Sequence, residues 1–385
     1  MIKKICIFIG SRANYSSIKS VMIEIKKKKF LKLQLILGAS AIVDKYGDLE
    51  KIITNDGFKI NKKIFFLIEG ENPITMAKST GLGLIGIAEA LKELSPDLVI
   101  TIGDRFETMA TTLASTYMNI PLAHTMGGEV TGTIDESIRH AITKFAHIHF
   151  PASKGASERI YKLGEDKNRI FNFGCPRIDL VKLELQKNRL KEINNKIFKD
   201  GVGPKLNLLK PFIIVSQHPV TTEFGDSEEQ ILITLKAVKK IGLQSIVLWP
   251  NADAGSQDIS RGLRKWREKF KSDNIHFFKN LNTNDYIQLL KHTSCLVGNS
   301  SSGIREGSFI GTPVVDIGSR QNSRERSTNV LNATHEINSI YYAIKKQLGK
   351  KYKSSSLYGS GNAAKKIVNQ ITKFKFIKIQ KKIRY

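Results

Sequence analysis

Short apolar runs rich in β-branched residues alternate along this chain with longer segments of helical periodicity. A continuous apolar run bounded by helical segments is typical of a strand that is buried on both faces of a parallel sheet. The runs form two series: residues 5–9, 33–37, 98–102 and 121–124, followed by 212–216, 245–248, 276–278, 295–297 and 313–317. We therefore predict an α/β protein with two Rossmann-like, doubly wound domains.

The chain is 385 residues long, which is about the length of two domains. We expect an N-terminal Rossmann-like domain over 1–175, a hinge over 176–210, a C-terminal Rossmann-like domain over 211–361, and a C-terminal helix with a basic tail over 362–385. In such sheets, ligands bind beyond the carboxyl ends of the strands. A site in a cleft between two facing domains is the expectation that follows.

The charge of the chain is strongly positive, with 61 Lys+Arg against 35 Asp+Glu and a net charge of +26. Such a balance suits an anionic partner, including a nucleic acid. The lysines, however, are spread over the whole chain, and aromatic residues are not interleaved with the basic runs as a base-stacking surface requires. We therefore expect no nucleic-acid partner.

The cysteines and the apolar runs favour a cytoplasmic protein without a membrane partner. Cys6, Cys175 and Cys295 are odd in number and far apart, so neither a disulfide framework nor a zinc pattern fits. The apolar run at 5–9 is too short for a signal peptide. No run approaches the ~18 apolar residues that span a bilayer.

Two motifs suggest cofactors that their context excludes. Residues 81–86 match the glycine fingerprint of dinucleotide-binding loops, but they lie inside a helical pattern that runs from Pro73 to Leu94. Small residues at a helix crossing are the alternative interpretation. His140, His147 and His149, on one predicted helix and its exit, lack the spacing of a zinc site. We expect neither a nicotinamide cofactor nor a metal.

Two loops carry candidate anion-binding groups. Residues 10–16 follow the first strand, and residues 298–306 follow a strand of the second series. Serine and glycine before a helix offer hydroxyl and N–H donors to a phosphate, and Glu306 could accept hydrogen bonds from ribose hydroxyls. An ordinary helix cap is the alternative for each loop. Together, the two loops predict a ligand that contains a diphosphate.

Carboxylates gather after two neighbouring strands of the first series. Residues 103–107 and 124–129 follow strands, and Asp135 and Glu136 precede a helix expected over 137–144. Like charges in a confined site raise one another's pKa, which provides one acid and one base near neutral pH. Helix capping is the alternative for Asp135 and Glu136. In the second series of strands, His218 follows a strand. There it either contacts the negative charge of a phosphate group or has only a structural role.

Segments in order over nearly the whole chain resemble the hydrolysing UDP-N-acetylglucosamine 2-epimerases, and especially the epimerase half of the bifunctional animal enzyme of sialic acid synthesis. The segments are 11–16, 103–105, 127–144, 217–222, 250–256, 298–301, 318–321 and 357–362. The resemblance implies a glycosyltransferase-B-like fold, no cofactor, a UDP-sugar substrate and a homodimer or homotetramer. It also implies that UDP-N-acetylglucosamine and water give N-acetylmannosamine and UDP through a 2-acetamidoglucal.

The resemblance also assigns roles to individual residues. It implies catalytic roles for Asp104, Asp135 and Glu136, with Glu129 beside them and with His218 acting on the phosphate. The positions that it implies for UDP binding are Arg12, Ser16, Arg105, His218, Asn251, Ser300, Ser301, Glu306 and Arg320.

One position departs from the family pattern. Close relatives have a glutamate, a proposed catalytic acid, where this chain has Met126. Either another acid such as Glu129 takes that role, or the sugar substituent in the pocket differs. The second possibility keeps open a UDP-2,4-diacetamido-2,4,6-trideoxyhexose as substrate, which would lead to a legionaminic-type sugar. A glycosyltransferase on the same architecture is a further alternative.

Overall fold

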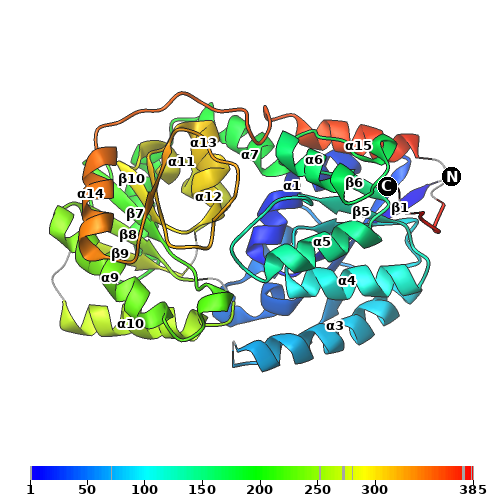
Figure 1. Cartoon of the computed structure of the whole chain (residues 1–385), viewed down its shortest axis with the longest axis horizontal. Helices are drawn as coiled ribbons and strands as arrows, with labels where there is room; N and C mark the ends of the chain where they lie inside the picture. The colour runs from blue at the N-terminus through cyan, green and yellow to red at the C-terminus, as the bar shows by residue number, and fades with distance from the viewer. Residues whose placement is uncertain are drawn as a thin grey trace. The chain divides into compact units, whose positions relative to one another are not determined.

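The computed structural model divides the chain into two compact units (Figure 1). Unit 1 contains Met1–Val130, Ile134–Leu180 and Tyr358–Tyr385, and unit 2 contains Thr131–Thr133 and Val181–Leu357. The structure describes residues 2–70, 72–250, 253–270, 274–279, 281–374, 378–382 and 384. Each unit is built on a six-stranded sheet in which all described strand pairs are parallel, which confirms the predicted α/β class with two doubly wound sheets.

The sheet of unit 1 has the strand order β3-β2-β1-β4-β5-β6. Its strands are β1 Lys3–Ile9, β2 Leu31–Gly38, β3 Lys62–Ile64, β4 Leu98–Ile102, β5 Leu122–Thr125 and β6 Ile148–Phe150. The central strands β1 and β4 pair with Ile5 opposite Leu98. Both residues are fully buried because helices cover both faces of the sheet.

Several helices of unit 1 begin at recognisable caps. The helices of this unit are α1 Arg12–Lys26, α2 Leu49–Asn55, α3 Pro73–Leu94, α4 Phe106–Tyr117, α5 Asp135–Phe145, α6 Lys154–Lys162 and α15 Ala363–Lys373, with α7 Pro176–Leu185 running from unit 1 into unit 2. The Ser11 hydroxyl accepts the N–H of Asn14 and so begins α1. At the start of α3, Asn72 and Thr75 form a capping box around Pro73.

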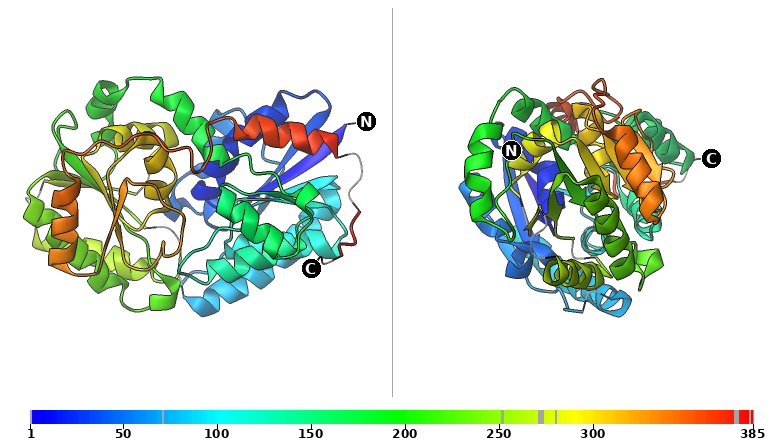
Figure 2. Two further views of the ribbon diagram at one scale, coloured as in Figure 1. Left: turned by 45° about the horizontal axis from the view of Figure 1, so that its top comes forward. Right: turned by 90° about the vertical axis from the view of Figure 1, so that its left-hand side faces the viewer.

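The C-terminal part of the chain completes unit 1. Helix α15 lies beside α1 (Figure 2). The Asp179 carboxylate accepts the N–H groups of Ala363 and Ala364 at 3.0 and 2.8 Å and thereby caps α15. Farther along, Lys381 Nζ lies 2.6 Å from Glu165 Oε2. The expected C-terminal helix exists, but it ends at Lys373, and residues 375–377 lie outside the described part of the chain.

The fingerprint-like glycines lie in the middle of α3, as the helical pattern predicts. They do not mark a helix crossing. A Cβ on Gly83 would lie 2.9 Å from the Phe66 ring, and one on Gly86 would lie 2.5 Å from Ile64 Cγ2. These two glycines therefore let α3 pack closely on the edge of the sheet at β3, which corrects the interpretation of helix-on-helix packing.

Unit 2 repeats the architecture with the strand order β12-β11-β10-β7-β8-β9. Its strands are β7 Phe212–Ser216, β8 Gln244–Leu248, β9 Ile275–Phe278, β10 Cys295–Gly298, β11 Val314–Ile317 and β12 Val330–Ala333. Its helices are α8 Leu190–Lys196, α9 Ser227–Ile241, α10 Ser256–Lys269, α11 Thr283–His292, α12 Ser301–Ile304, α13 Glu306–Ile310 and α14 Ile337–Gln347. One core lies against α9, α10 and α14, and a second core lies under α8 and α11.

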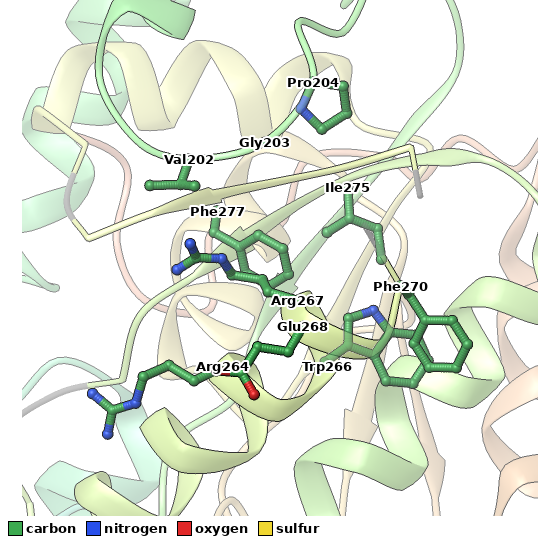
Figure 3. Close-up of a pocket in the computed structure, with 10 residues that line it drawn as sticks. All are labelled: Val202, Gly203, Pro204, Arg264, Trp266, Arg267, Glu268, Phe270, Ile275 and Phe277. Atoms are coloured by element: carbon green, nitrogen blue, oxygen red, sulfur yellow. The ribbon is translucent and has the colours of Figure 1, made fainter. Parts of the chain in front are cut away.

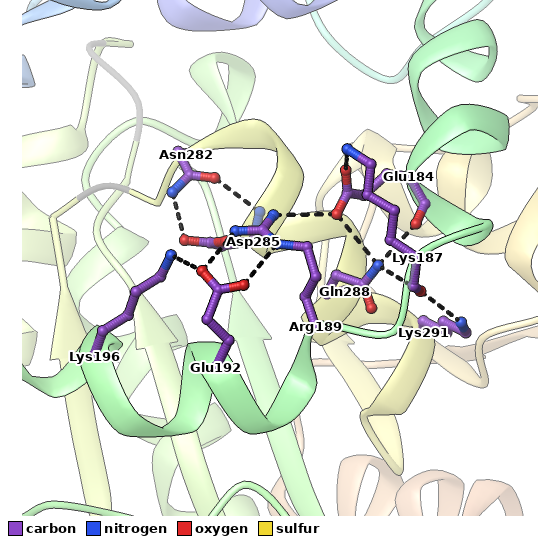
Figure 4. Close-up of polar contacts among 9 residues, drawn as sticks. All are labelled: Glu184, Lys187, Arg189, Glu192, Lys196, Asn282, Asp285, Gln288 and Lys291. Atoms are coloured by element: carbon purple, nitrogen blue, oxygen red, sulfur yellow. Dashed lines mark hydrogen bonds and ion pairs between the residues drawn. The ribbon is translucent and has the colours of Figure 1, made fainter.

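The segment after α7 is held onto unit 2 by polar contacts (Figure 4). The Arg189 guanidinium lies 3.2 Å from Glu184 Oε1, 3.1 Å from Glu192 Oε2 and 3.3 Å from Asp285 Oδ1. The Gln288 amide donates to the backbone carbonyl of Glu184 at 2.8 Å. Residues 181–199 are therefore bonded to α11.

Three short strands were not predicted from the sequence. They are β3, β6 and β12, with three, three and four residues.

His149, expected at the exit of a helix, lies in β6, and its Nε2 lies 3.1 Å from Glu165 Oε2. Burial opposes ionisation of Glu165, but hydrogen bonds from His149, Lys144 and Lys381 outweigh it and lower the pKa of this carboxyl to about 2. Within the described residues, no helix is long and apolar enough to cross a bilayer.

Candidate active site

Several of the predicted site residues lie at the switch point of each sheet. In unit 1 the strand order reverses between β1 and β4, and in unit 2 it reverses between β7 and β10. Ligands of doubly wound sheets bind at the carboxyl ends of the strands at this point. The loops after β1 and β4 carry Arg12 and Asp104, and the loops after β7 and β10 carry His218 and Ser300. The geometry of each unit therefore agrees with a ligand site at these loops.

The loop after β1 is packed tightly against the loop after β4. A Cβ on Gly10 would lie 2.3 Å from Glu107 Cγ, so only glycine fits here. Glu107 is fully buried and pairs with Arg105 at 2.9 Å. Arg12 begins α1, and burial lowers its pKa below the usual value for arginine. Ser16, one turn later on α1, is half-buried.

A buried arginine connects two of the predicted acids. The Arg139 side chain is 1% exposed, and its Nη2 forms an ion pair with Asp104 Oδ2. Its Nη1 donates to the backbone carbonyl of Glu129 at 2.6 Å. Asp104 is 23% exposed and Glu129 is buried. Arg139 therefore fixes the loops after β4 and β5 to each other.

A neutral histidine supports the same loop. His124, in β5, is fully buried, and its Nε2 lies 2.7 Å from the carbonyl oxygen of Gly103. Burial lowers the pKa of His124 to about 3, against the hydrogen bond to Gly103, so the ring is neutral at physiological pH. We infer that Nε2–H donates to Gly103, the residue directly before Asp104.

The backbone after β5 turns sharply at Met126. This residue is 5% exposed and has a φ of +61°, which is costly for a residue other than glycine. Its sulfur lies 3.7 Å from Cys175 Sγ. A Cβ on Gly128, whose φ is +74°, would lie 2.3 Å from the carbonyl oxygen of Ala156. The turn is thus held by close packing, and Met126 presents an apolar side chain where the resemblance described above predicts a carboxylate.

Asp135 and Glu136 form the first turn of α5, which therefore begins two residues before the predicted position. Ile134 offers no capping side chain, and both carboxylates are half-buried. The partial positive charge of a helix N-terminus stabilises ionised carboxylates in its first turn. Asp135 and Arg139 are four residues apart and therefore share one face of α5. Asp104 and the backbone carbonyl of Glu129 thus contact Arg139, and Asp135 lies on the same face of α5 as this arginine.

In unit 2, an asparagine fixes His218. The Asn299 amide accepts the N–H of His218 at 2.7 Å and donates to the carbonyl oxygen of His218 at 2.8 Å. A Cβ on Gly298, whose φ is +131°, would lie 2.2 Å from the carbonyl oxygen of Ser216. Gly298 therefore lets the loops after β7 and β10 approach each other, and His218, which is 8% exposed, is fixed between them.

Hydroxyl groups follow Asn299. Ser300 caps α12 by accepting the N–H of Ser302, which agrees with the alternative of an ordinary helix cap. The Ser302 hydroxyl bonds Ser300 at 2.9 Å and Tyr286 at 2.6 Å. Ser301 is the first residue of α12 and Glu306 is the first residue of α13, where it is 3% exposed. These positions supply N–H and hydroxyl donors together with one buried carboxylate.

Arginines complete this end of unit 2. Arg320 Nη1 donates to the carbonyl oxygen of Asn299 at 3.2 Å. Asp316 lies in β11, and burial raises the pKa of its carboxyl to about 6. The positive charges of Arg326, Arg320 and Arg324 lower this pKa but do not outweigh burial. The loops after β7, β10 and β11 therefore bring His218, Ser300, Ser301 and Arg320 to one edge of the sheet. Asn251 lies outside the described residues.

A cavity of about 410 Å³ lies elsewhere in unit 2 (Figure 3). It is lined by the edge strand β9, helix α10 and the segment around Gly203. Its walls include Trp266, Phe270 and Phe277, and the Arg267 guanidinium lies 6.0 Å from the centre of the Phe277 ring. None of the predicted site residues lines this cavity.

Three residues that hold these loops in place, Arg139, Asn299 and Glu107, have no role predicted from the sequence. The sequence pattern around Arg139 could have indicated a buried role, because this residue shares the buried face of α5 with Ile142. A charged residue on an apolar helix face requires a buried partner. Asn299 and Glu107 lie inside motifs that the analysis quoted, but their partners are distant in the chain. No local pattern identifies such partners.

Comparisons with known proteins agree with this arrangement. The family model described as UDP-N-acetylglucosamine 2-epimerase matches residues 23–372. A GDP/UDP-N,N'-diacetylbacillosamine 2-epimerase (hydrolyzing) of Campylobacter jejuni is 33% identical, over 92% of this chain and 89% of the relative. A UDP-N-acetylglucosamine 2-epimerase of Neisseria meningitidis is 30% identical, over 94% of this chain and 92% of the relative.

A solved structure shows the same fold. The crystal structure of UDP-GlcNAc 2-epimerase from Neisseria meningitidis bound to UDP-GlcNAc aligns with a TM-score of 0.79 and 18% identity, covering 97% of this chain and 100% of that chain. The fold is therefore glycosyltransferase-B-like. The chain belongs to the UDP-N-acetylglucosamine 2-epimerase family, which confirms the recognition made from the sequence.

Proposed function

We propose that this protein is a hydrolysing 2-epimerase that converts UDP-N-acetylglucosamine and water into N-acetylmannosamine and UDP. The observation that carries the proposal is the Asp104–Arg139 ion pair at the switch point of unit 1, with the Glu129 carbonyl on the same guanidinium. A carboxylate held in a fixed position on a buried cation is suited to proton transfer. Family membership supports the same reaction class.

In the proposed reaction, a carboxylate among Asp104, Glu129, Asp135 and Glu136 takes the proton from C2 of the sugar. The C2–H electron pair forms a double bond to C1 as the C1–O bond breaks, and UDP leaves with that bond's electrons. A carboxylic acid then returns a proton to C2 on the opposite face as the oxygen of water bonds to C1, and the water gives up one proton to the carboxylate that this acid has become. The products are N-acetylmannosamine and UDP, and the proton first taken from C2 leaves the base to solvent, so that the acid and base are both restored.

We propose that unit 2 holds the UDP group. His218 and Arg320 would face the diphosphate, which gains charge as it leaves, and the N–H and hydroxyl groups at Ser300 and Ser301 would donate hydrogen bonds to it. Glu306 would accept from the ribose hydroxyls. The contact that supports this assignment is the pair of hydrogen bonds by which Asn299 fixes His218 beside these serines.

A second substrate is supported by one specific observation. Met126 is buried at the end of β5, where the family pattern has a glutamate. An apolar side chain at this position suits a sugar that carries a methyl group in place of a hydroxyl. The Campylobacter jejuni relative is named for a diacetylbacillosamine. A UDP-2,4-diacetamido-2,4,6-trideoxyhexose, which would feed a legionaminic-type pathway, is therefore the alternative to the sialic acid route.

Proton NMR in deuterium oxide tests the proposal with each of the two UDP-sugars in turn. We expect release of UDP and of a free sugar with inverted configuration at C2 and deuterium at C2. Release of a sugar with unchanged C2 and no deuterium would contradict the epimerase. Turnover that occurs only after addition of an acceptor would instead indicate a glycosyltransferase.

We also propose a cytoplasmic location. Cys6, Cys175 and Cys295 are buried free thiols. Burial raises the pKa of Cys6 to about 12 and that of Cys295 above its usual range, so neither thiol ionises at physiological pH. Unpaired thiols of this kind agree with a reducing compartment.

A further inference from the structure

Helix α5, which carries Asp135 and Glu136 in its first turn, ends without a glycine at its C-terminus. Its C-cap is Ala146, in an extended conformation with a φ of −70° and a ψ of 148°. Carbonyl groups at the end of a helix have no partner within the helix and need one from elsewhere. Two of these groups, those of Lys144 and Ala146, are bonded by the same side chain, which comes from residue 381.

The side chain of Lys381 makes three contacts at this point. Its Nζ donates to the carbonyl oxygen of Lys144 at 2.7 Å and to that of Ala146. The same Nζ lies 2.6 Å from Glu165 Oε2. An ammonium group has three N–H donors, so the donors and these acceptors are equal in number. A positive charge at the C-terminal end of a helix also interacts favourably with the helix dipole. Lys381 therefore caps α5 from outside the helix.

Glu165 joins α5 to Lys381 by a second route. The Glu165 side chain is 3% exposed, and its Oε1 lies 2.7 Å from the Nζ of Lys144, in the last turn of α5. Lys144 Nζ also donates to the carbonyl oxygen of Leu163 at 2.8 Å. The last turn of α5 is thus bonded to Lys381 through its backbone and to Glu165 through a side chain. A change at Lys381 would leave Glu165 with Lys144 and His149 as partners.

The segment that carries this lysine is itself fixed before and after it. His147 Nδ1 accepts the N–H of Leu122 at 3.1 Å, so the neutral ring carries its proton on Nε2, which lies 3.0 Å from the carbonyl oxygen of Ile379. Burial lowers the pKa of His147, which favours this neutral form. Farther along, the Arg384 guanidinium lies 2.9 Å from Asp166 Oδ2. The position of the lysine ammonium group is therefore determined by contacts on both sides of it in the chain.

The other end of α5 belongs to the candidate site of unit 1. Asp135 and Glu136 lie in its first turn, and Arg139, one turn later, pairs with Asp104. The first turn has no side-chain cap from Ile134. A helix of 11 residues is about 16 Å long, and its backbone hydrogen bonds make it move largely as one body. A contact that fixes its last turn therefore also restricts where its first turn lies.

We propose that Lys381 is a positioning residue that holds α5 in the place where its acids can take part in proton transfer. The lysine contacts the last turn of α5 and Glu165, so it acts through the backbone of the helix and not on the substrate. This inference rests on the proposed function, because it assumes that the acids of α5 take part in the reaction. Small displacements of reacting groups are costly, since about 1 Å can lower a rate about 100-fold.

Steady-state kinetics of Lys381→Met test this role at a temperature at which thermal denaturation shows the variant to be folded. We expect kcat to fall about tenfold, because the acids are less well placed. We expect KM for the UDP-sugar to change less than twofold, because the UDP group is assigned to unit 2. A change that only lowered stability would leave kcat unaltered in the folded chain. A kcat within twofold of wild type would therefore overturn the inference.

Two further variants separate the role of this ammonium group from general effects on the C-terminal segment. Lys382→Met is the matched control, the same change at the next residue, which is exposed, and it should leave kcat and KM unchanged. Lys381→Arg keeps the positive charge and N–H donors and should recover part of the lost kcat. An equal fall in the Lys382 variant, or an arginine variant as slow as the methionine variant, would contradict the proposed role.

Hydrogen exchange followed by mass spectrometry gives a readout that does not depend on turnover. We expect the backbone amides of residues 135–146 to exchange faster in Lys381→Met than in wild type, and to be unchanged in Lys382→Met. Unchanged exchange in Lys381→Met would overturn the inference. If the wild-type chain releases no UDP from either UDP-sugar, the proposed function fails, whereas the exchange result still decides whether Lys381 fixes α5.

Discussion

The two switch points are built from different chemistry. In unit 1 the loops are joined by a buried ion pair, Arg139 with Asp104, and by the neutral His124. In unit 2 the corresponding loops are joined by the uncharged amide of Asn299 and by a chain of hydroxyl groups. A buried charged side chain stabilises the fold only while its oppositely charged partner is present, and loss of that partner is costly. Burying an amide costs little free energy once its donor and acceptor are hydrogen-bonded. The comparison agrees with the proposal that unit 1 carries out the proton transfer and unit 2 holds the UDP group.

The largest expected effect comes from a change to an acid in unit 1. Asp104→Asn keeps the shape of the side chain but removes the charge, so we expect kcat to fall about 10³-fold while UDP affinity changes little. Steady-state kinetics together with calorimetric titration of UDP would measure both. Glu158→Gln, at an exposed residue of α6, is the control. A kcat within about threefold of wild type would remove Asp104 from the proposed mechanism.

The next largest expected effect is a loss of stability when the buried Arg139 is replaced. Arg139→Met leaves Asp104 without its partner, and we expect the free energy of unfolding to fall by about 3–5 kcal/mol. Urea denaturation measures this change. Adding Asp104→Asn to the same chain should recover part of the loss, because the unpaired charge is gone. Additive losses in the double variant would show that the pair is not coupled.

The matching change in unit 2 is Asn299→Ala. It removes both hydrogen bonds to His218, and we expect a loss of about 2 kcal/mol in stability. We further expect KM for the UDP-sugar to rise more than kcat falls. Asn299→Asp keeps the acceptor but not the donor and should lie between alanine and wild type. A fall in kcat as large as that of Asp104→Asn, without a change in KM, would contradict the division of roles.

The last expected effect is a dependence on pH. The pKa of His124 is about 3 in the folded chain and about 6.5 when unfolded, so the unfolded chain binds one more proton between these values. The contribution of His124 is complete above pH 6.5, and stability falls by up to about 1.4 kcal/mol per pH unit below it. His124→Gln should have a shallower slope in urea titrations at a series of pH values. Equal slopes would contradict the neutral buried ring.

The fold was predictable because its strands are buried on both faces. Strands such as β1 and β7 have continuous apolar sequences, so they were found, whereas β3, with the sequence Lys-Lys-Ile at the sheet edge, has no such pattern. Asp104 and His218 were predicted because each lies two residues after the end of a buried strand. The partners of these two residues were not predicted, because Arg139 is 35 residues from Asp104 in the chain and Asn299 is 81 residues from His218. Such pairs arise only when the sheet order brings distant loops together.

The position of α15 has a consequence for biosynthesis. Unit 1 takes its last helix from residues 363–373, whose first N–H groups bind Asp179. Every residue of unit 2 therefore leaves the ribosome before the N-terminal half can acquire its full complement of helices. Translation thus imposes an order in which unit 2 is the first unit to be complete, although the strands of unit 1 are made earlier. A stop codon before residue 363 would remove α15 from the unit whose strands were synthesised first.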